Sequence, residues 1–289
     1  MTTLRVAAGL FLAALATGCA AQENTTITPQ PSEVPPPSKA VTSLRLPFDS
    51  YEMTENELHE TANVRDFLTR QCMNERGHDW PLVQRPTGMP QAAHRRRYGV
   101  IEDAIARRYG YRVPEELFDP YGVQSAQRLR GERLTPAQEE AAYGTRETGC
   151  ERTAFNKLVP RTRPDFNTFN DLKGSIFTEF QRTPEARTYT TAWSNCMKGK
   201  GHTYPDPFAP INDPRWRTEL SLATPTPEEV RTARHDVACK EATGLVAGWR
   251  QAESNLQNRA ITTRPDYFHE LDRSRKEQLA RARAIPVKP

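Results

Sequence analysis

Two stretches of the chain, residues 72–81 and 196–205, bring together side chains that bind soft and borderline metal ions. Each stretch begins with Cys-Met and has a histidine six positions after the cysteine. A zinc ion takes cysteine and histidine ligands, so two such pairs could together form a metal site. The pairs are Cys72 with His78 and Cys196 with His202.

Disulfide formation is the alternative chemistry for these cysteines. The chain has five cysteines and no C-x-x-C, the spacing common in zinc ribbons and thioredoxin-like sites. If Cys19 carries a lipid, four remain, and the repeated motif favours one bridge in each copy. The loop-entropy model gives each bridge roughly 4 kcal/mol of stabilisation. We predict disulfides Cys72–Cys150 and Cys196–Cys239, no cofactor, and metal binding by His78 and His202 as the weaker alternative.

The two stretches belong to a longer internal repeat. Five of their ten positions are identical, and two further markers follow in the same order in both halves. Thr-Pro precedes the second cysteine of each half, at Thr135 and Thr226, and Arg-Pro-Asp follows it. Markers repeated in a constant order indicate a duplicated unit. We therefore predict two tandem helical repeats, residues 45–182 and 183–289, with an insert at 82–134 in the first copy alone.

The repeated markers describe helix ends and helix starts. Gly77 and Gly201 fit the left-handed residue that ends a helix, with the next residue, a histidine, packing back on the methionine. Thr226 fits a helix cap, and Glu229 would close its capping box, as Gln138 would for Thr135. Hydrophobic periodicity and capping signals predict an all-α fold, with helices over about 55–76, 101–108, 184–197, 227–259 and 265–284.

The N-terminus has the composition of an export signal. Residues 1–18 hold one cation and an apolar run too short to span a bilayer as a mature helix. They end in Leu15-Ala16-Thr17-Gly18 before Cys19, which resembles the lipobox of bacterial lipoproteins and implies a lipid on Cys19. Residues 19–44 are rich in proline, so we predict a disordered tether that reaches roughly 75 Å from the membrane.

Charge is nearly balanced, with 40 Lys and Arg against 36 Asp and Glu. A net charge of +4 spread over the whole chain does not indicate nucleic-acid binding, which needs a concentrated basic face. The insert carries the one locally basic stretch, where arginines and tyrosines alternate. It could bind an anionic polymer or lipid headgroups, or it could be a solvated surface on which arginine stems cover tyrosine rings. The arginines are Arg95, Arg96, Arg97, Arg107 and Arg108.

Several of these features together resemble a group of uncharacterised secreted lipoproteins of high-GC Gram-positive (actinobacterial) bacteria. The features are the lipobox, the proline-rich tether, Leu46-Pro47-Phe48-Asp49-Ser50-Tyr51, the duplicated CM-x3-G motif, RRYGV with RRYGY, and a second cysteine before a long helix. The resemblance covers about residues 45–285. It implies an outward-facing protein anchored to the cell membrane, and it implies no activity or ligand.

Motifs of hydrolytic chemistry are missing from the sequence. His59-Glu60 and His269-Glu270 begin like a zincin helix, but neither has the second histidine four residues after the first. There is no G-x-S-x-G, no P-loop and no G-x-G-x-x-G. We expect a non-catalytic surface lipoprotein with a binding or structural role in the cell envelope and a cell-wall or envelope-protein partner. A cell-envelope hydrolase acting on peptidoglycan or protein is the alternative, because two carboxylates need only meet in space.

Overall fold

The computed structural model describes residues 25–144, 148–217 and 224–287. Over these ranges the chain is mostly helical, which confirms the all-α prediction. The α-helices are α1 (Lys39–Thr42), α2 (Glu55–Glu75), α3 (Asp103–Tyr109), α4 (Glu115–Phe118), α5 (Val123–Arg133), α6 (Pro136–Tyr143), α7 (Cys150–Leu158), α8 (Phe166–Phe180), α9 (Pro184–Gly199), α10 (Pro214–Arg217), α11 (Pro227–Thr243), α12 (Leu245–Thr263) and α13 (Pro265–Arg283). Two 3-10 helices, η1 (Pro47–Tyr51) and η2 (Ala209–Asn212), and two parallel strands, β1 (Thr26–Ile27) and β2 (Leu82–Val83), complete the described elements.

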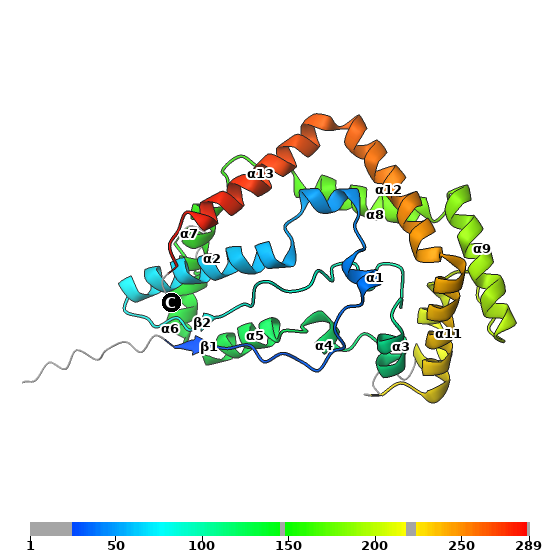
Figure 1. Ribbon diagram of the computed structural model, residues 1–289. Coiled ribbons are helices and arrows are strands. Elements are labelled where there is room, and N and C mark those ends of the chain that lie inside the picture. The colour runs from blue at the N-terminus through cyan, green and yellow to red at the C-terminus, as the bar shows by residue number, and fades with distance from the viewer. Residues whose placement is uncertain (1–24, 145–147, 218–223, 288–289) are drawn as a thin grey trace, which may run out of the picture.

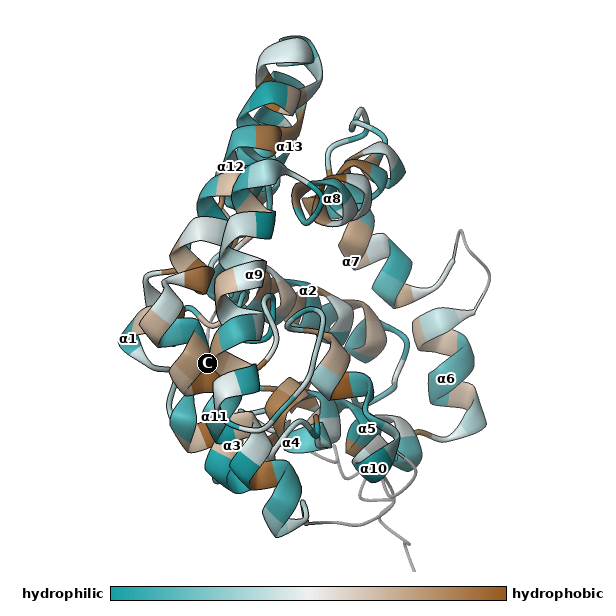
Figure 2. Ribbon diagram, turned by 90° about the vertical axis from the view of Figure 1, so that its right-hand side faces the viewer, coloured by the Kyte–Doolittle hydropathy of each residue, from teal (hydrophilic) through white to brown (hydrophobic). Residues whose placement is uncertain are grey.

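The helices α12 and α13 meet at an angle and form the top of an arch (Figure 1). The helix α13 packs on α2 and α7, and α12 packs on α8 and α9. The helix α11 continues from α12 down the outer end of the molecule, where it packs on α3 and α9. Hydrophilic and hydrophobic residues alternate along α12 and α13, as expected for helices that bury one face (Figure 2).

The two predicted helix ends are confirmed in detail. Gly77 and Gly201 have φ of 77° and 84°, in the left-handed region that glycine adopts at low cost. The carbonyl of Met73 accepts a hydrogen bond from the amide of His78 at 3.0 Å, and the same 3.0 Å bond joins the second copy's histidine amide to the carbonyl of Met197. This is the Schellman pattern. Both methionines are fully buried beneath these turns.

The predicted helix starts are confirmed except for one side chain. Thr135 and Gln138 form the expected reciprocal capping box at the start of α6. Thr226 caps α11 by accepting from the amide of Glu229. The Glu229 carboxylate, however, does not close that box. It is fully buried and accepts hydrogen bonds from the amide of Tyr111 and from Arg112, so a tertiary contact has replaced the local one.

The single long helix predicted over 227–259 is wrong. Gly244 has φ of 66° and separates α11 from α12. The break changes the direction of the chain, and α12 packs on α9, where the Trp249 indole donates to the carbonyl of Ala186 at 3.2 Å. Gly248 lies so close to the Tyr189 ring that a Cβ there would stand 2.1 Å from a ring carbon. Packing against α9 therefore takes precedence over a continuous helical period.

Both predicted disulfides are present. Cys72 is bonded to Cys150 and Cys196 to Cys239, with Cα atoms 5.6 and 5.7 Å apart. Cys150 and Cys239 are fully buried. Each bridge joins the last turn of one helix to a later helix, as the repeat predicts. The tandem repeat itself and its boundaries stay a prediction.

The prediction of a disordered tether is wrong for residues 25–44. These residues run along the lower edge of the molecule and then up to α1 (Figure 1). Ile27, Val41 and Leu44 are buried, and β1 pairs with β2. These three apolar side chains are spaced along the proline-rich segment, and their burial holds the segment against the folded body. The predicted signal peptide and Cys19 lie outside the described residues, and within those residues no helix is long and apolar enough to cross a membrane.

Candidate binding site beside helix α11

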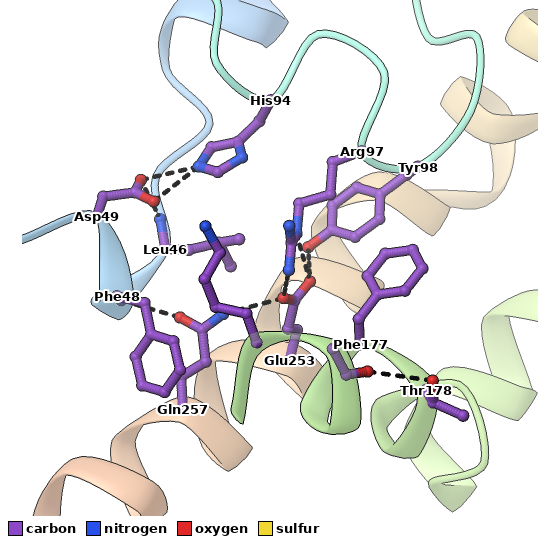
Figure 3. A network of polar contacts seen from close by, with 12 residues as sticks. Leu46, Phe48, Asp49, His94, Arg97, Tyr98, Phe177, Thr178, Glu253 and Gln257 are labelled. Carbon is purple, nitrogen blue, oxygen red and sulfur yellow. Dashed lines mark hydrogen bonds and ion pairs between the residues drawn. The ribbon is translucent and has the colours of Figure 1, made fainter. Parts of the chain in front are cut away.

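Three of the five arginines predicted to bind an anion, Arg95, Arg96 and Arg97, are held by internal partners. Arg97 forms a two-pronged ion pair with Glu253 of α12, a fully buried residue that also accepts from the Tyr98 hydroxyl at 2.9 Å (Figure 3). Arg95 binds Glu102 and the carbonyl of Pro35. Arg96 donates to the carbonyl of Tyr111 at 2.9 Å, and burial lowers the pKa of its guanidinium to about 10.

These contacts remove Arg95, Arg96 and Arg97 from the predicted anion-binding surface. Arg95 and Arg97 are paired with carboxylates of the chain and Arg96 donates to a backbone carbonyl, so all three attach the insert to the rest of the molecule. Arg107 remains largely exposed beside Asp103, and Arg108 lies over the Tyr109 ring at 5.3 Å. The second arrangement matches the alternative in which arginine stems cover tyrosine rings.

The buried face of α11 carries a line of polar groups that holds the insert. Asp236 accepts from the Trp193 indole at 2.8 Å and from Lys240 at 2.9 Å. Lys240 also donates to the carbonyl of Val100 at 2.9 Å, and Glu229 binds the backbone of Tyr111 as described above. Burial raises the pKa of Asp236 and lowers that of Lys240, because both charged forms are removed from water. These groups are enclosed by the chain, which suits a structural role.

The Asp66 carboxylate on α2 organises the other end of the molecule in the same way. It accepts from Arg130 at 2.6 Å, from Arg85 at 3.1 Å and from the Trp80 indole at 3.1 Å. All four side chains are buried. Burial alone would raise the pKa of Asp66, but the two guanidinium groups outweigh it, so the pKa lies below its usual value.

Two histidines meet on the outer surface of the second half. His202, which follows the end of α9, places Nε2 2.9 Å from Nδ1 of His235 on α11. At this distance one ring donates and the other accepts, so the two rings cannot both be protonated while the bond is formed. Burial, the neighbouring histidine and the positive charges of Arg215 and Arg231 lower the pKa of His202. Burial and nearby cations, among them Lys200, likewise lower the pKa of His235.

The predicted pairing of His78 with His202 at a metal is not formed. The two residues follow the ends of α2 and α9, on opposite sides of the molecule (Figure 1), and the cysteines beside them are in disulfides. Within the described ranges no group of three or more His, Cys, Asp and Glu side chains could hold a metal ion. His78 is half-buried at its helix end.

An open groove of about 680 Å³ runs between α3 and α11, next to the histidine pair. The apolar side chains of Val230 and Ala238 contribute to its lining, and Arg231 and Arg234 stand at it, both exposed. Arg234 also binds Asp103 across the groove at 3.0 Å. The complete lining is Asp103, Pro225, Pro227, Val230, Arg231, Arg234, His235 and Ala238.

This groove combines an apolar lining with guanidinium and imidazole donors at its edge. Such a surface can bind a ligand that has an anionic group joined to an apolar body. It contains no nucleophile with an adjacent base among the described lining residues, so binding is the chemistry that the arrangement supports.

Sequence reasoning missed His235 and the two groove arginines. A signal existed for His235, because it stands four residues before Cys239 and therefore on the same face of α11. Since Cys239 is bridged to Cys196, that face also approaches His202, which follows Cys196 by six residues. Combining the predicted disulfide with helical spacing would have brought the two histidines together.

No family profile, no curated protein and no solved structure matches this chain.

Proposed function

We propose that this protein is a non-catalytic lipoprotein that is anchored to the cell membrane through Cys19, faces outward, and binds a partner in the cell envelope. The observation that carries the proposal is the pair of disulfides, Cys72–Cys150 and Cys196–Cys239. Stable disulfides form in oxidising compartments and are rare in the cytosol. The apolar leader before Cys19 supplies a route to such a compartment.

Binding is favoured over catalysis because the strongly buried charges are engaged within the fold. Glu253 is held by Arg97 and Tyr98, and Asp66 by two arginines. The groove beside α11 is the described surface where cations, imidazole and apolar side chains lie together facing solvent. A wall polymer or an envelope protein with a carboxylate or phosphate group fits that surface. Among the described residues, no contact specifically favours the hydrolase alternative or the metal-binding alternative.

Compartment and anchor are tested by expressing the full chain in a high-GC Gram-positive host fed an alkyne-bearing palmitate. We expect labelled protein in the membrane fraction, and no label on a Cys19→Ala variant. Peptide mapping without reduction should recover the two disulfide-linked peptides. A cytosolic, unlabelled protein with free thiols at Cys72 and Cys196 would overturn the proposal.

The binding role is tested by placing a photo-crosslinking amino acid at Ala238, an exposed residue of the groove, and irradiating intact cells. The matched control is Ala192, an exposed alanine on α9 away from the groove lining. We expect a discrete crosslinked species from position 238 that is absent from position 192. Equal crosslinking from both positions, or none from either, would count against a partner at this groove.

A further inference from the structure

Residues 25–44, here called the strap, are attached to the folded body along their whole length. At the first end Leu82 donates its amide to the carbonyl of Thr25 at 3.0 Å, and Gln84 donates to the carbonyl of Ile27 at 3.2 Å. Ile27 is buried in a small apolar cluster with Val83 and Ala126. The Thr25 hydroxyl also donates to Asp79 at 3.0 Å.

The middle of the strap lies directly against the backbone before α5. A Cβ on Gly122 would stand 2.2 Å from the carbonyl oxygen of Gln30, so this approach requires glycine there. Gly122 also has φ of 69°, a second reason for that residue. Two residues further on, the amide of Ser32 donates to the carbonyl of Pro120 at 3.0 Å.

The second end of the strap is tied by the insert and by the main apolar cluster. The carbonyl of Pro35 accepts from Arg95, and the amide of Ser38 donates to Glu102 at 2.6 Å. Val41 and Leu44 are only 1% and 4% exposed and pack in the cluster that contains Tyr98. Polar and apolar contacts therefore alternate from Thr25 to Leu44, which differs from the behaviour of a free linker.

We propose that the strap holds the body close to the bilayer in a fixed orientation, with the end that carries β1 and α6 facing the lipid surface. The proposal rests on lipidation of Cys19. Only residues 20–24 separate that cysteine from the strap, and a fully extended chain of this length spans roughly 20 Å. A free tether would have allowed roughly 75 Å.

The fixed orientation has a consequence for the groove. The strand β1 lies near α6 at one end of the molecule, whereas α3 and α11, which line the groove, lie at the other end (Figure 1). An anchor at the β1 end presents the groove away from the membrane. The β1 end therefore contacts the bilayer, and the groove remains accessible to a partner in the wall.

The strap is tested without any lipid by hydrogen exchange on the Cys19→Ser chain. We expect slow exchange at the amides of Ser32, Ser38 and Gln84, which donate across the strap contacts. Exchange as fast as in an unstructured peptide at these three amides would overturn the docked strap. The variant Ile27→Asp should speed exchange at Gln84, whereas Thr28→Asp, at an exposed neighbour, should not.

The orientation is tested with the lipidated chain in vesicles by energy transfer to a labelled phospholipid. Fluorophores are placed one at a time on Ala137→Cys in α6 and on Asn195→Cys in α9, both exposed positions. We expect strong transfer from position 137 and weak transfer from position 195, with the difference lost in Ile27→Asp. Equal transfer from both positions in the otherwise wild-type chain would overturn the orientation.

The two proposals fail in distinguishable ways. A chain that does not float with vesicles and carries no lipid overturns the lipoprotein function and with it the membrane orientation, while the exchange result still decides the strap. A chain that floats but transfers energy equally from both positions keeps the lipoprotein function and overturns the orientation alone.

Discussion

A single carboxylate, that of Asp66, neutralises two buried guanidinium groups and orients an indole. Replacing it in Asp66→Ala leaves Arg85 and Arg130 buried without their partner, since both side chains are at most 6% exposed. Removing one partner of a buried ion pair costs about 3–5 kcal/mol. We expect a loss of that size in the free energy of unfolding, measured by urea denaturation.

The matched control is Asp171→Ala, an exposed aspartate on α8. Surface substitutions of this kind change stability by about 0.5 kcal/mol or less. The pKa of Asp66 is lowered in the folded state, so its contribution is complete above the unfolded value of about 3.9 and is lost as pH falls through the lower folded value. Asp66→Ala should therefore flatten the acid limb of the stability curve, and an unchanged acid limb would contradict this account.

The pair of His202 and His235 predicts a second pH dependence, at higher pH. Both pKa values lie below the usual 6.5, so the unfolded chain binds more protons than the folded one just below that pH. Stability from the pair is complete above about pH 6.5 and declines as pH falls through the folded pKa values. We expect the thermal unfolding midpoint of the wild-type chain to fall as the pH is lowered below about 6.5.

Replacing one ring in His235→Gln removes the neighbouring imidazole, whose own protonation opposes that of His202. The pH dependence over that window should shrink, while His269→Gln, at an exposed histidine of α13, should leave it intact. Identical pH profiles for the wild-type and His235→Gln chains would show that the pair does not control this transition.

Helix ends were predictable because their determinants lie within a few residues. Gly77 and Gly201 adopt the left-handed conformation that ends a helix, whatever the rest of the chain packs against. The Thr135 and Gln138 side chains accept from backbone amides within three residues. The Glu229 carboxylate shows the limit of this reasoning. Its sequence context is that of a capping box, but Tyr111 and Arg112, more than a hundred residues away, offer a buried alternative.

The break at Gly244 was missed for a related reason. Hydrophobic residues continue at helical spacing across it, and only the packing of α12 on α9 requires a change of direction. The groove was missed because, in the sequence alone, Arg231 and Arg234 have the spacing of an ordinary solvent-exposed helix face. Only the fold shows that α3 lies beside them. Sequence patterns fix elements and their ends, whereas the partners of charged side chains depend on the assembled fold.

Gly244 allows a clean test of backbone strain at an element boundary. Nothing lies within 4 Å of a Cβ built on it, so Gly244→Ala introduces no clash. Its only cost is the backbone strain of an alanine held at a φ of 66°. We expect a loss of about 1–2 kcal/mol in the free energy of unfolding. The control Gly174→Ala, inside α8 and equally open, should instead stabilise the protein by roughly 0.5–1 kcal/mol. Effects of equal sign at both positions would contradict the assignment of a left-handed break.

At the scale of the whole molecule, the predicted halves share their main core. The largest apolar cluster includes Phe48 and Tyr98 from the first half with Trp193, Trp249 and Phe268 from the second. Arg97 and the buried Glu253 add an ion pair across the same junction (Figure 3). The strap is tied into this core as well, through Val41 and Leu44. Shared packing of this extent favours a single cooperative unit over two independently folding repeats.

The two disulfides make that cooperativity measurable, because each lies in a different half. The Cys72–Cys150 bridge closes a sequence separation of 78 residues and the Cys196–Cys239 bridge one of 43. The loop-entropy model assigns them about 4.5 and about 4 kcal/mol. The double variants Cys72→Ala/Cys150→Ala and Cys196→Ala/Cys239→Ala should each lose stability of that order.

Each variant should still unfold in one calorimetric transition, at a lower temperature than the wild-type chain. A shared core transmits the destabilisation of either half to the whole, whereas independent repeats would let the unmodified half unfold at its original temperature. Two separated transitions, one of them at the wild-type midpoint, would therefore show that the Arg97–Glu253 junction does not couple the halves.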